Sequence, residues 1–127
     1  MKIKDLKPGD SLFLVGSIMP DENIENSFSK FEVKSTLETL DGKRNTITCI
    51  SGKIDDSIAY FTALSNEDIN GIRVKIRIDK WSEKFTRTIS EYRKFLSFSN
   101  NTEGLDFLER KFSEYIKNIK ELRRNEI

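Results

Sequence analysis

Hydrophobic and polar residues alternate with a period of two over long parts of this chain, a pattern typical of β-strands that are buried on one face. In the segment 30–40, one face carries Phe31, Val33, Ser35, Leu37 and Thr39. In the segment 71–79, the inward face carries Ile72, Val74, Ile76 and Ile78, and the basic side chains between them point outward. Both segments are therefore predicted to be half-buried strands of an antiparallel sheet.

The beginning of the chain supplies another strand. The apolar run 11–19 is short enough for a strand, and Gly16 lies inside it, where we expect a bulge or a bend. The polar stretch 20–27 that follows is predicted to be a loop.

Two hairpins complete the predicted sheet. The β-branched segment 45–51 follows Asp41-Gly42, a strong hairpin signal, and is expected to end at Gly52. A short turn around residues 80–83 leads into the segment 84–95, which is predicted to be the last strand.

Two segments are predicted to be helical. Within 54–69, one helical stripe carries Ile54, Ile58, Phe61 and Leu64. Asp55 or Asp56 would cap its start, which explains these carboxylates more simply than a site for a hard cation. A longer helix follows the polar loop 97–102, with Thr102 as its expected N-cap.

The C-terminal helix has apolar residues at spacings of three and four, as in a heptad seam. The seam consists of Leu105, Leu108, Phe112, Tyr115, Ile119 and Leu122. This stripe either covers the barrel or pairs with another chain as an oligomerisation surface, and the pattern alone leaves both possibilities open.

The chain of 127 residues fits a single domain, with a barrel over 1–96 and a linker and amphipathic helix over 97–127. Strand, strand, strand, short helix, strand, strand is the order of a five-stranded Greek-key barrel of the OB type. The fold class is therefore predicted to be mainly β, with a short helix between strands three and four and a C-terminal α-helix.

A family resemblance supports this prediction. The segment GIRVKIRIDKWSEKFTRTISEYRKF (71–95) resembles the last hairpin of OB nucleic-acid-binding domains. KPGDSLFLVGSI (7–18) is similar to their first strand, and FEVKSTLETLDGKRNTITCI (31–50) to their second and third strands. The pattern most resembles the OB module of bacterial HD-domain exoribonucleases and replication-associated proteins. The resemblance implies binding of single-stranded nucleic acid.

The chain departs from those exoribonucleases in two ways. Their catalysis belongs to a separate metal-binding domain with His and Asp ligands, whereas this chain contains no histidine. A tryptophan that often follows their third strand is replaced by Gly52-Lys53. The resemblance therefore implies a binding module and not an enzyme.

Charge is unevenly distributed. The net charge is only +1, but residues 71–95 contain eight basic and three acidic side chains. Such a basic segment is typical of a face that binds polyanions. Trp81, the only tryptophan, lies in the predicted turn of this segment, where a base would stack on its ring. Alternatively, Trp81 folds back onto the barrel and the basic strand is simply a solvated face.

The predicted nucleic-acid contacts combine this tryptophan with a track of cations for phosphates. They are Trp81, Lys80, Lys84, Arg73, Lys75, Arg77, Arg87, Lys34, Lys30 and Arg44. Glu32 and Glu38 lie among them on the second strand and would repel phosphates, so the affinity is expected to be modest and sensitive to salt.

The residue inventory argues against catalysis. Without histidine there is no Ser-His or Cys-His couple, and the single Cys49 is predicted to be a small buried residue of a strand. We expect no cofactor, no metal and no membrane contact, and a cytoplasmic location. The predicted function is non-catalytic binding of single-stranded DNA or RNA. The alternative is an assembly module of a replication, conjugation or phage complex.

Overall fold

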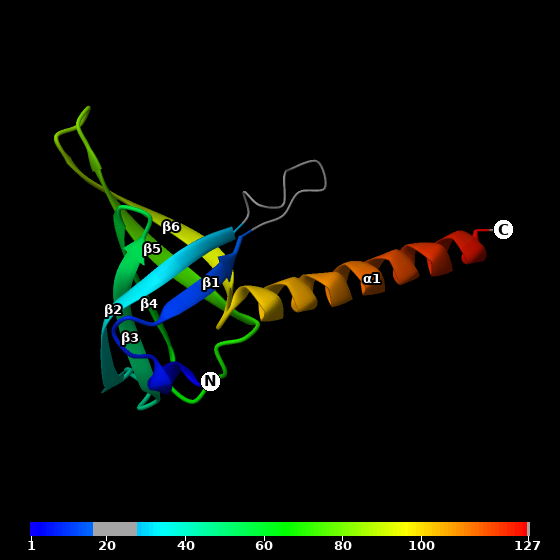
Figure 1. Ribbon diagram of the computed structural model, residues 1–127, viewed down its shortest axis with the longest axis horizontal. Coiled ribbons are helices and arrows are strands. Elements are labelled where there is room, and N and C mark those ends of the chain that lie inside the picture. The colour runs from blue at the N-terminus through cyan, green and yellow to red at the C-terminus, as the bar shows by residue number, and fades with distance from the viewer. Residues whose placement is uncertain (17–27, 127) are drawn as a thin grey trace.

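The structure is a computed structural model that describes residues 1–16 and 28–126. In these residues, six antiparallel strands form one sheet that closes into a barrel, and a long helix follows (Figure 1). The strands are β1 (Ser11–Val15), β2 (Phe28–Leu40), β3 (Thr46–Ile54), β4 (Ser57–Leu64), β5 (Ile72–Ser82) and β6 (Arg87–Phe98). A 3₁₀-helix, η1 (Ile3–Asp5), precedes them, and the helix α1 (Asn101–Asn125) comes last. The predicted class, mainly β with a C-terminal helix, is confirmed.

The order of the strands differs from the prediction. Each strand pairs with the next one along the chain, and β1 pairs with β6 to close the ring. The described residues therefore form an up-and-down barrel of six strands, and the predicted five-stranded Greek-key order is wrong.

The difference arises at residues 54–69, where the predicted short helix is wrong and the strand β4 is found. Ile54 pairs with Ser57 across a two-residue turn of Asp55 and Asp56. Asp55 has a φ of +52°, a conformation that short polar residues tolerate better than most. In β4, the small Ala59 and the ring of Phe61 face the core, while apolar residues also occur on the outer face. Apolar residues on both faces hid the alternation.

A β-bulge in β2 reverses the faces to which the side chains after Lys34 point. Val33 pairs with Gly52 and Ser35 with Ser51, so Lys34 has no partner of its own. Residues after the bulge therefore face the opposite way from those expected, as a one-residue shift requires. Phe31 and Val33 are fully buried as predicted, but Leu37 is 66% exposed on the outer surface.

Gly52 lies opposite Val33, where this bulge begins. It lies inside β3 and does not end the strand, contrary to the prediction. A Cβ atom at this position would lie 2.1 Å from the carbonyl oxygen of Glu32 and 2.7 Å from the ring of Phe31. Only glycine lets the two strands and the Phe31 ring approach this closely.

Several predicted boundaries also move. β1 ends at Val15, before Gly16, and residues 17–27, with the rest of the predicted first strand and the polar loop, lie outside the described residues. The turn between β5 and β6 lies at residues 83–86, three residues later than expected. The N-cap of α1 is Asn100 and not Thr102, since the Asn100 side chain accepts a hydrogen bond of 2.9 Å from the backbone N–H of Glu103.

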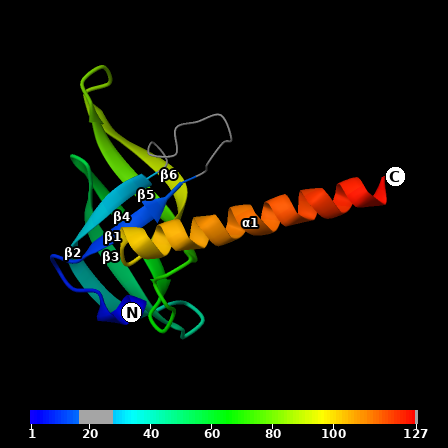
Figure 2. The ribbon, with the colours of Figure 1, turned by 45° about the vertical axis from the view of Figure 1, so that its right-hand side comes forward.

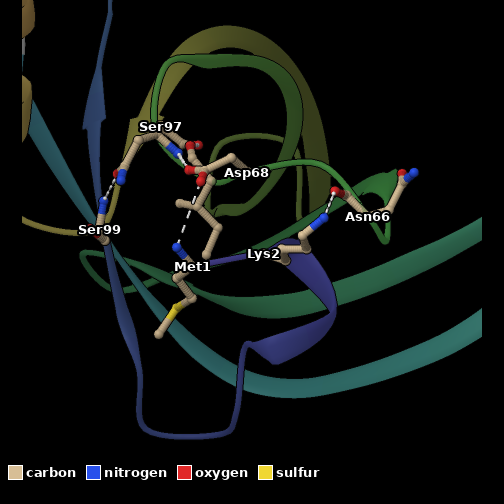
Figure 3. Close-up of polar contacts among 8 residues, drawn as sticks. Met1, Lys2, Asn66, Asp68, Ser97 and Ser99 are labelled. Carbon is tan, nitrogen blue, oxygen red and sulfur yellow. Dashed lines mark hydrogen bonds and ion pairs between the residues drawn. The ribbon is translucent and has the colours of Figure 1, made fainter.

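The barrel interior is mainly apolar, and the N-terminal segment covers one end of it. Ile3 of η1 is fully buried in the core, and its backbone N–H donates to the Glu67 carbonyl at 2.9 Å. Beside it, the Lys2 ammonium donates to the Asn66 carbonyl at 3.1 Å, and the Met1 amino group lies 3.7 Å from the Asp68 carboxylate (Figure 3). This end of the barrel is therefore held by the segment between β4 and β5.

The helix α1 packs on the barrel only at its beginning. Gly104 and Leu108 are its buried residues, and Leu108 packs with Val15 and Phe98 against the outer side of β1 and β6. Beyond this contact α1 extends away from the barrel (Figures 1 and 2). The predicted seam is therefore divided: Leu108 covers the barrel, and the later residues are exposed.

Candidate nucleic-acid interface

An open groove of about 400 Å³ crosses the outer surface of five consecutive strands. We call it the outer groove. It is lined by Ser35 and Leu37 from β2, Cys49, Ile50 and Ser51 from β3, Tyr60, Phe61 and Thr62 from β4, Lys75 and Arg77 from β5, and Tyr92 from β6. The β2 bulge contributes to the groove, because it turns Ser35 and Leu37 outward.

Five of these residues form a single row across the sheet. The direct register partners are Ser35 and Ser51, then Ser51 and Tyr60, then Tyr60 and Arg77, then Arg77 and Tyr92. We call this set the cross-strand row. Adjacent strands lie roughly 4.8 Å apart, so the row spans about 19 Å. Side chains that face each other across strands in this way act as one surface.

The row combines aromatic rings, one cation and hydroxyl groups, and the cation of Lys75 lies beside it. The Arg77 guanidinium lies 4.6 Å from the centre of the Tyr60 ring, and the Lys75 ammonium lies 5.1 Å from the centre of the Tyr92 ring. At the other end of the row, the hydroxyl groups of Ser35 and Ser51 are hydrogen bonded to each other. Tyr92 is 60% exposed, so its ring is available to a ligand.

Arg77 is held in place from two sides. Its Nε atom lies 3.5 Å from the Asp79 carboxylate, which accepts a hydrogen bond of 2.7 Å from the Ser90 hydroxyl. That Nε atom is buried and makes no hydrogen bond within the described residues. The Tyr60 ring and the Asp79 carboxylate therefore fix the guanidinium in the groove without occupying all its donors.

The β5–β6 hairpin extends beyond the barrel (Figure 1). β4 pairs with β5 only from Ile58 to Tyr60, so β5 beyond Asp79 pairs with β6 alone. Trp81 lies on this extension, in β5 and not in a turn, and is 66% exposed. It is four residues from Arg77 on the same face, a distance of about 13 Å along a strand. Trp81 does not fold back onto the barrel.

The structure brings some of the predicted contacts together. Lys75 and Arg77 line the outer groove, and Arg73 is exposed on the same face of β5. Lys84 and Arg87 lie 5.6 and 5.7 Å from the centre of the Phe85 ring at the hairpin turn.

Other predicted contacts form ion pairs or lie away from the outer groove. Lys80 lies 3.5 Å from the Glu91 carboxylate, and Lys34 lies 2.8 Å from that of Glu32. The hydrogen bond from Lys34, with its positive charge, lowers the pKa of Glu32. Lys30 lines a separate hollow with Phe13 and Phe28.

Arg44 is the most distant of the predicted contacts. It lies in the β2–β3 turn, whereas the strand register places the hairpin extension near the β3–β4 turn, at the other end of the barrel. Arg44 and Trp81 therefore do not belong to one surface.

Both tyrosines of the cross-strand row were absent from the residues predicted from the sequence. The helix predicted over 54–69 hides the outward position of Tyr60, and the pattern of the last strand, 84–95, marks its basic residues more clearly than Tyr92. Cys49 is also placed differently: it is half-buried on the outer groove and not in the core. An alternation of Ala59 and Phe61 with Tyr60 and Thr62 was the signal that would have revealed the missing strand.

Metal ligands and membrane-spanning helices are not found in the described residues. No group of three or more His, Cys, Asp or Glu side chains there is arranged to hold a metal ion. Over the same ranges, 1–16 and 28–126, no helix is both long and apolar enough to cross a membrane.

Comparisons with known proteins give no further guide to function. No protein-family model matches this chain, and neither the curated proteins nor the solved structures include a significant match. The resemblance to OB domains therefore stays a prediction, and functional inference depends on the groove itself.

Proposed function

We propose that this protein binds single-stranded nucleic acid across the outer groove, without chemistry of its own. The cross-strand row is the observation that carries this proposal. Unpaired bases stack on aromatic rings and on guanidinium planes, and the row presents Tyr60, Arg77 and Tyr92 side by side. The serine hydroxyls at its other end supply donors and acceptors for base edges or sugars.

Cations next to the row suit a phosphate backbone. Lys75 faces the groove, and its cross-strand partner is Lys94, which is exposed beside it. Release of counterions from phosphates on such a surface would make binding depend strongly on salt. Asp79 lies between Arg77 and Trp81 and would repel phosphates, so we expect modest affinity and few phosphate contacts.

The exposed Trp81 ring gives this site a natural reporter. A ligand that fills the outer groove and continues along β5 reaches Trp81 and quenches its fluorescence. A ligand that covers the groove alone leaves the tryptophan unchanged, so the titration also measures the extent of the site.

The direct test is a titration of a labelled single-stranded oligonucleotide, DNA and RNA in parallel, at low and rising salt. Tyr92→Ala should weaken binding about tenfold, since base stacking contributes about 1–3 kcal/mol. At concentrations where the chain is monomeric, Tyr115→Ala is the matched control, because Tyr115 is 67% exposed on α1, outside the groove. Lys75→Gln should lower the salt dependence, whereas Arg44→Gln at the other end of the barrel should not.

Cys49 offers a second readout that does not depend on affinity. Its thiol lines the groove, so a bound oligonucleotide should slow its reaction with an alkylating reagent. Absence of binding at low salt, or equal effects of Tyr92→Ala and Tyr115→Ala, would contradict the proposal. Binding without protection of Cys49 would place the ligand elsewhere.

Assembly is the second candidate function, and the free part of α1 favours it. Beyond Leu108 the residues of α1 are exposed, including the apolar Phe112, Ile116, Ile119 and Leu122. An apolar stripe without tertiary contacts is typical of a docking surface for another protein chain. Light scattering on the full chain and on a chain ending at Lys111, which keeps Phe107 and Leu108 on the barrel, would show whether the free part of α1 is responsible for association.

A further inference from the structure

The barrel does not pack against the exposed part of α1 that follows Leu108. Residues after Leu108 extend about 25 Å from the contact with β1 and β6, counted from Glu109 to Asn125 at 1.5 Å per residue. In proteins, most of the stability of a helix comes from tertiary packing of its apolar face. The exposed apolar stripe of α1 therefore needs a partner that the barrel does not supply.

Heptad positions define the surface that such a partner meets. With Leu105 and Leu108 at a and d, the exposed core positions are Phe112 and Ile119 at a, and Tyr115 and Leu122 at d. The flanking e positions are then Glu109, Ile116 and Arg123. We call these seven residues, from Glu109 to Arg123, the distal seam.

We propose that the distal seam pairs with the same surface of a second copy of this chain, in antiparallel orientation. In an antiparallel pair each e position faces an e position of the other helix. Glu109 then faces Arg123 of the second copy, Arg123 faces its Glu109, and Ile116 faces its own counterpart at the centre. The core layers match Phe112 with Leu122 and Tyr115 with Ile119, so each layer pairs an aromatic residue with an aliphatic one.

The parallel arrangement lacks this complementarity. There an e position faces the g position of the preceding heptad. Ile116 would face Lys111, Arg123 would face Asn118, and Glu109 would face Gly104, which is buried against the barrel. No opposite charges would meet, and the two barrels would lie side by side at the same end of the helices.

The charge of the whole helix favours the same orientation. Residues 101–113 carry three acidic and two basic side chains, whereas residues 114–125 carry two acidic and four basic ones, so the net charge changes sign along the helix. Antiparallel pairing places the basic end beside the acidic end and opposes the two helix dipoles. Because α1 extends away from the barrel (Figure 2), this arrangement also keeps the two barrels apart, one at each end of the pair.

The test is a charge exchange in the full chain, followed by sedimentation equilibrium over a range of concentrations. Glu109→Arg should raise the dimer dissociation constant about tenfold, because two symmetric pairs change from attraction to repulsion. Arg123→Glu should do the same. The double variant should return to the wild-type constant, since opposite charges would again face each other at both symmetric e–e pairs.

Cross-linking tests the orientation in a Cys49→Ser background. Lys111 and Asn125 are both g positions and face each other across an antiparallel pair. A mixture of Lys111→Cys and Asn125→Cys chains should form the mixed disulfide. A wild-type chain that is monomeric at every concentration, a double variant weaker than either single one, or preferential linking of Asn125→Cys to itself would overturn the proposal. None of these outcomes bears on binding at the outer groove.

Discussion

At the scale of single residues, Gly52 determines how the sheet is shaped. It allows the Phe31 ring and the Glu32 carbonyl to lie against β3, and the bulge opposite it turns Ser35 and Leu37 toward the outer groove. The absence of a side chain at Gly52 therefore sets the packing of the core, and the bulge that begins opposite it sets the lining of the candidate site.

Gly52→Ala should lower the free energy of unfolding by roughly 2–4 kcal/mol, since the new Cβ would collide with backbone that cannot move aside cheaply. Urea denaturation followed by circular dichroism measures the change. Gly42→Ala is the matched control: a Cβ there meets nothing within 4 Å, and its unfolding midpoint should not fall. Equal stability of both variants would show that the bulge relaxes freely.

Asp41 stabilises the β2–β3 turn through its ionised form. Its carboxylate accepts hydrogen bonds from the backbone N–H groups of Lys43 and Asn45 at 2.7 and 2.8 Å, and from the Asn45 side chain at 3.1 Å. The backbone hydrogen bond from Asn45, followed by that from its side chain, lowers the pKa of Asp41. Because the pKa is lower in the folded state, this stabilisation is present above the unfolded pKa and is lost as the pH falls through the folded pKa.

Asp41→Ala should therefore destabilise the protein at neutral pH, and the difference from wild type should shrink as the pH falls below the folded pKa of Asp41. Urea midpoints of both proteins across this range measure it. Asp41→Asn keeps an acceptor oxygen but cannot titrate, so its own turn contribution should not vary with pH. A gap between wild type and Asp41→Ala that is constant with pH would contradict the assignment.

At the scale of elements, the sequence predicted strands where one face is uniformly apolar. In β5, Val74, Ile76 and Ile78 are buried as expected. The prediction failed in β4, because this strand has apolar residues on both faces. Over a few residues, some of them are spaced three or four apart, as the apolar residues of a helix are. The prediction also failed to orient the end of β2, since a bulge depends on the partner strand and leaves no mark in the local pattern.

The same reasons limited the prediction of the site. Lys75 and Arg77 were found because they alternate with buried residues, whereas the cross-strand row also needs β4 and the bulge. Register between strands is a property of the folded sheet, so the meeting of Tyr60, Arg77 and Tyr92 could not be derived from spacing along the chain.

The helix α1 has two parts with different roles, and truncation separates them. A chain ending at Lys111 keeps Phe107 and Leu108 on the barrel and should retain its unfolding free energy to within about 0.5 kcal/mol. A chain ending at Asn100 uncovers Val15 and Phe98 and should lose about 3 kcal/mol. Both are measured at concentrations where the full chain is monomeric, because association adds stability. Equal loss in the two chains would contradict this division.

At the scale of the whole molecule, the chain presents two separate surfaces. The outer groove lies across β2 to β6, and the distal seam lies on α1, beyond its contact with β1 and β6. Pairing through α1 would leave each groove outside the helical contact. A dimer would then offer two grooves to one strand of nucleic acid. The avidity of the two grooves together depends on the distance between the barrels.

The sequential order of the strands also determines which contacts are hardest to form. Neighbours in the barrel are neighbours along the chain, so most pairings close short loops at a small entropic cost. The pairing of β1 with β6 is different, because Phe13 meets Phe98 across nearly the whole barrel sequence. Such a distant contact slows folding. The rate-limiting event is therefore expected to be the closing of the ring between these two strands, where the first turns of α1 also pack.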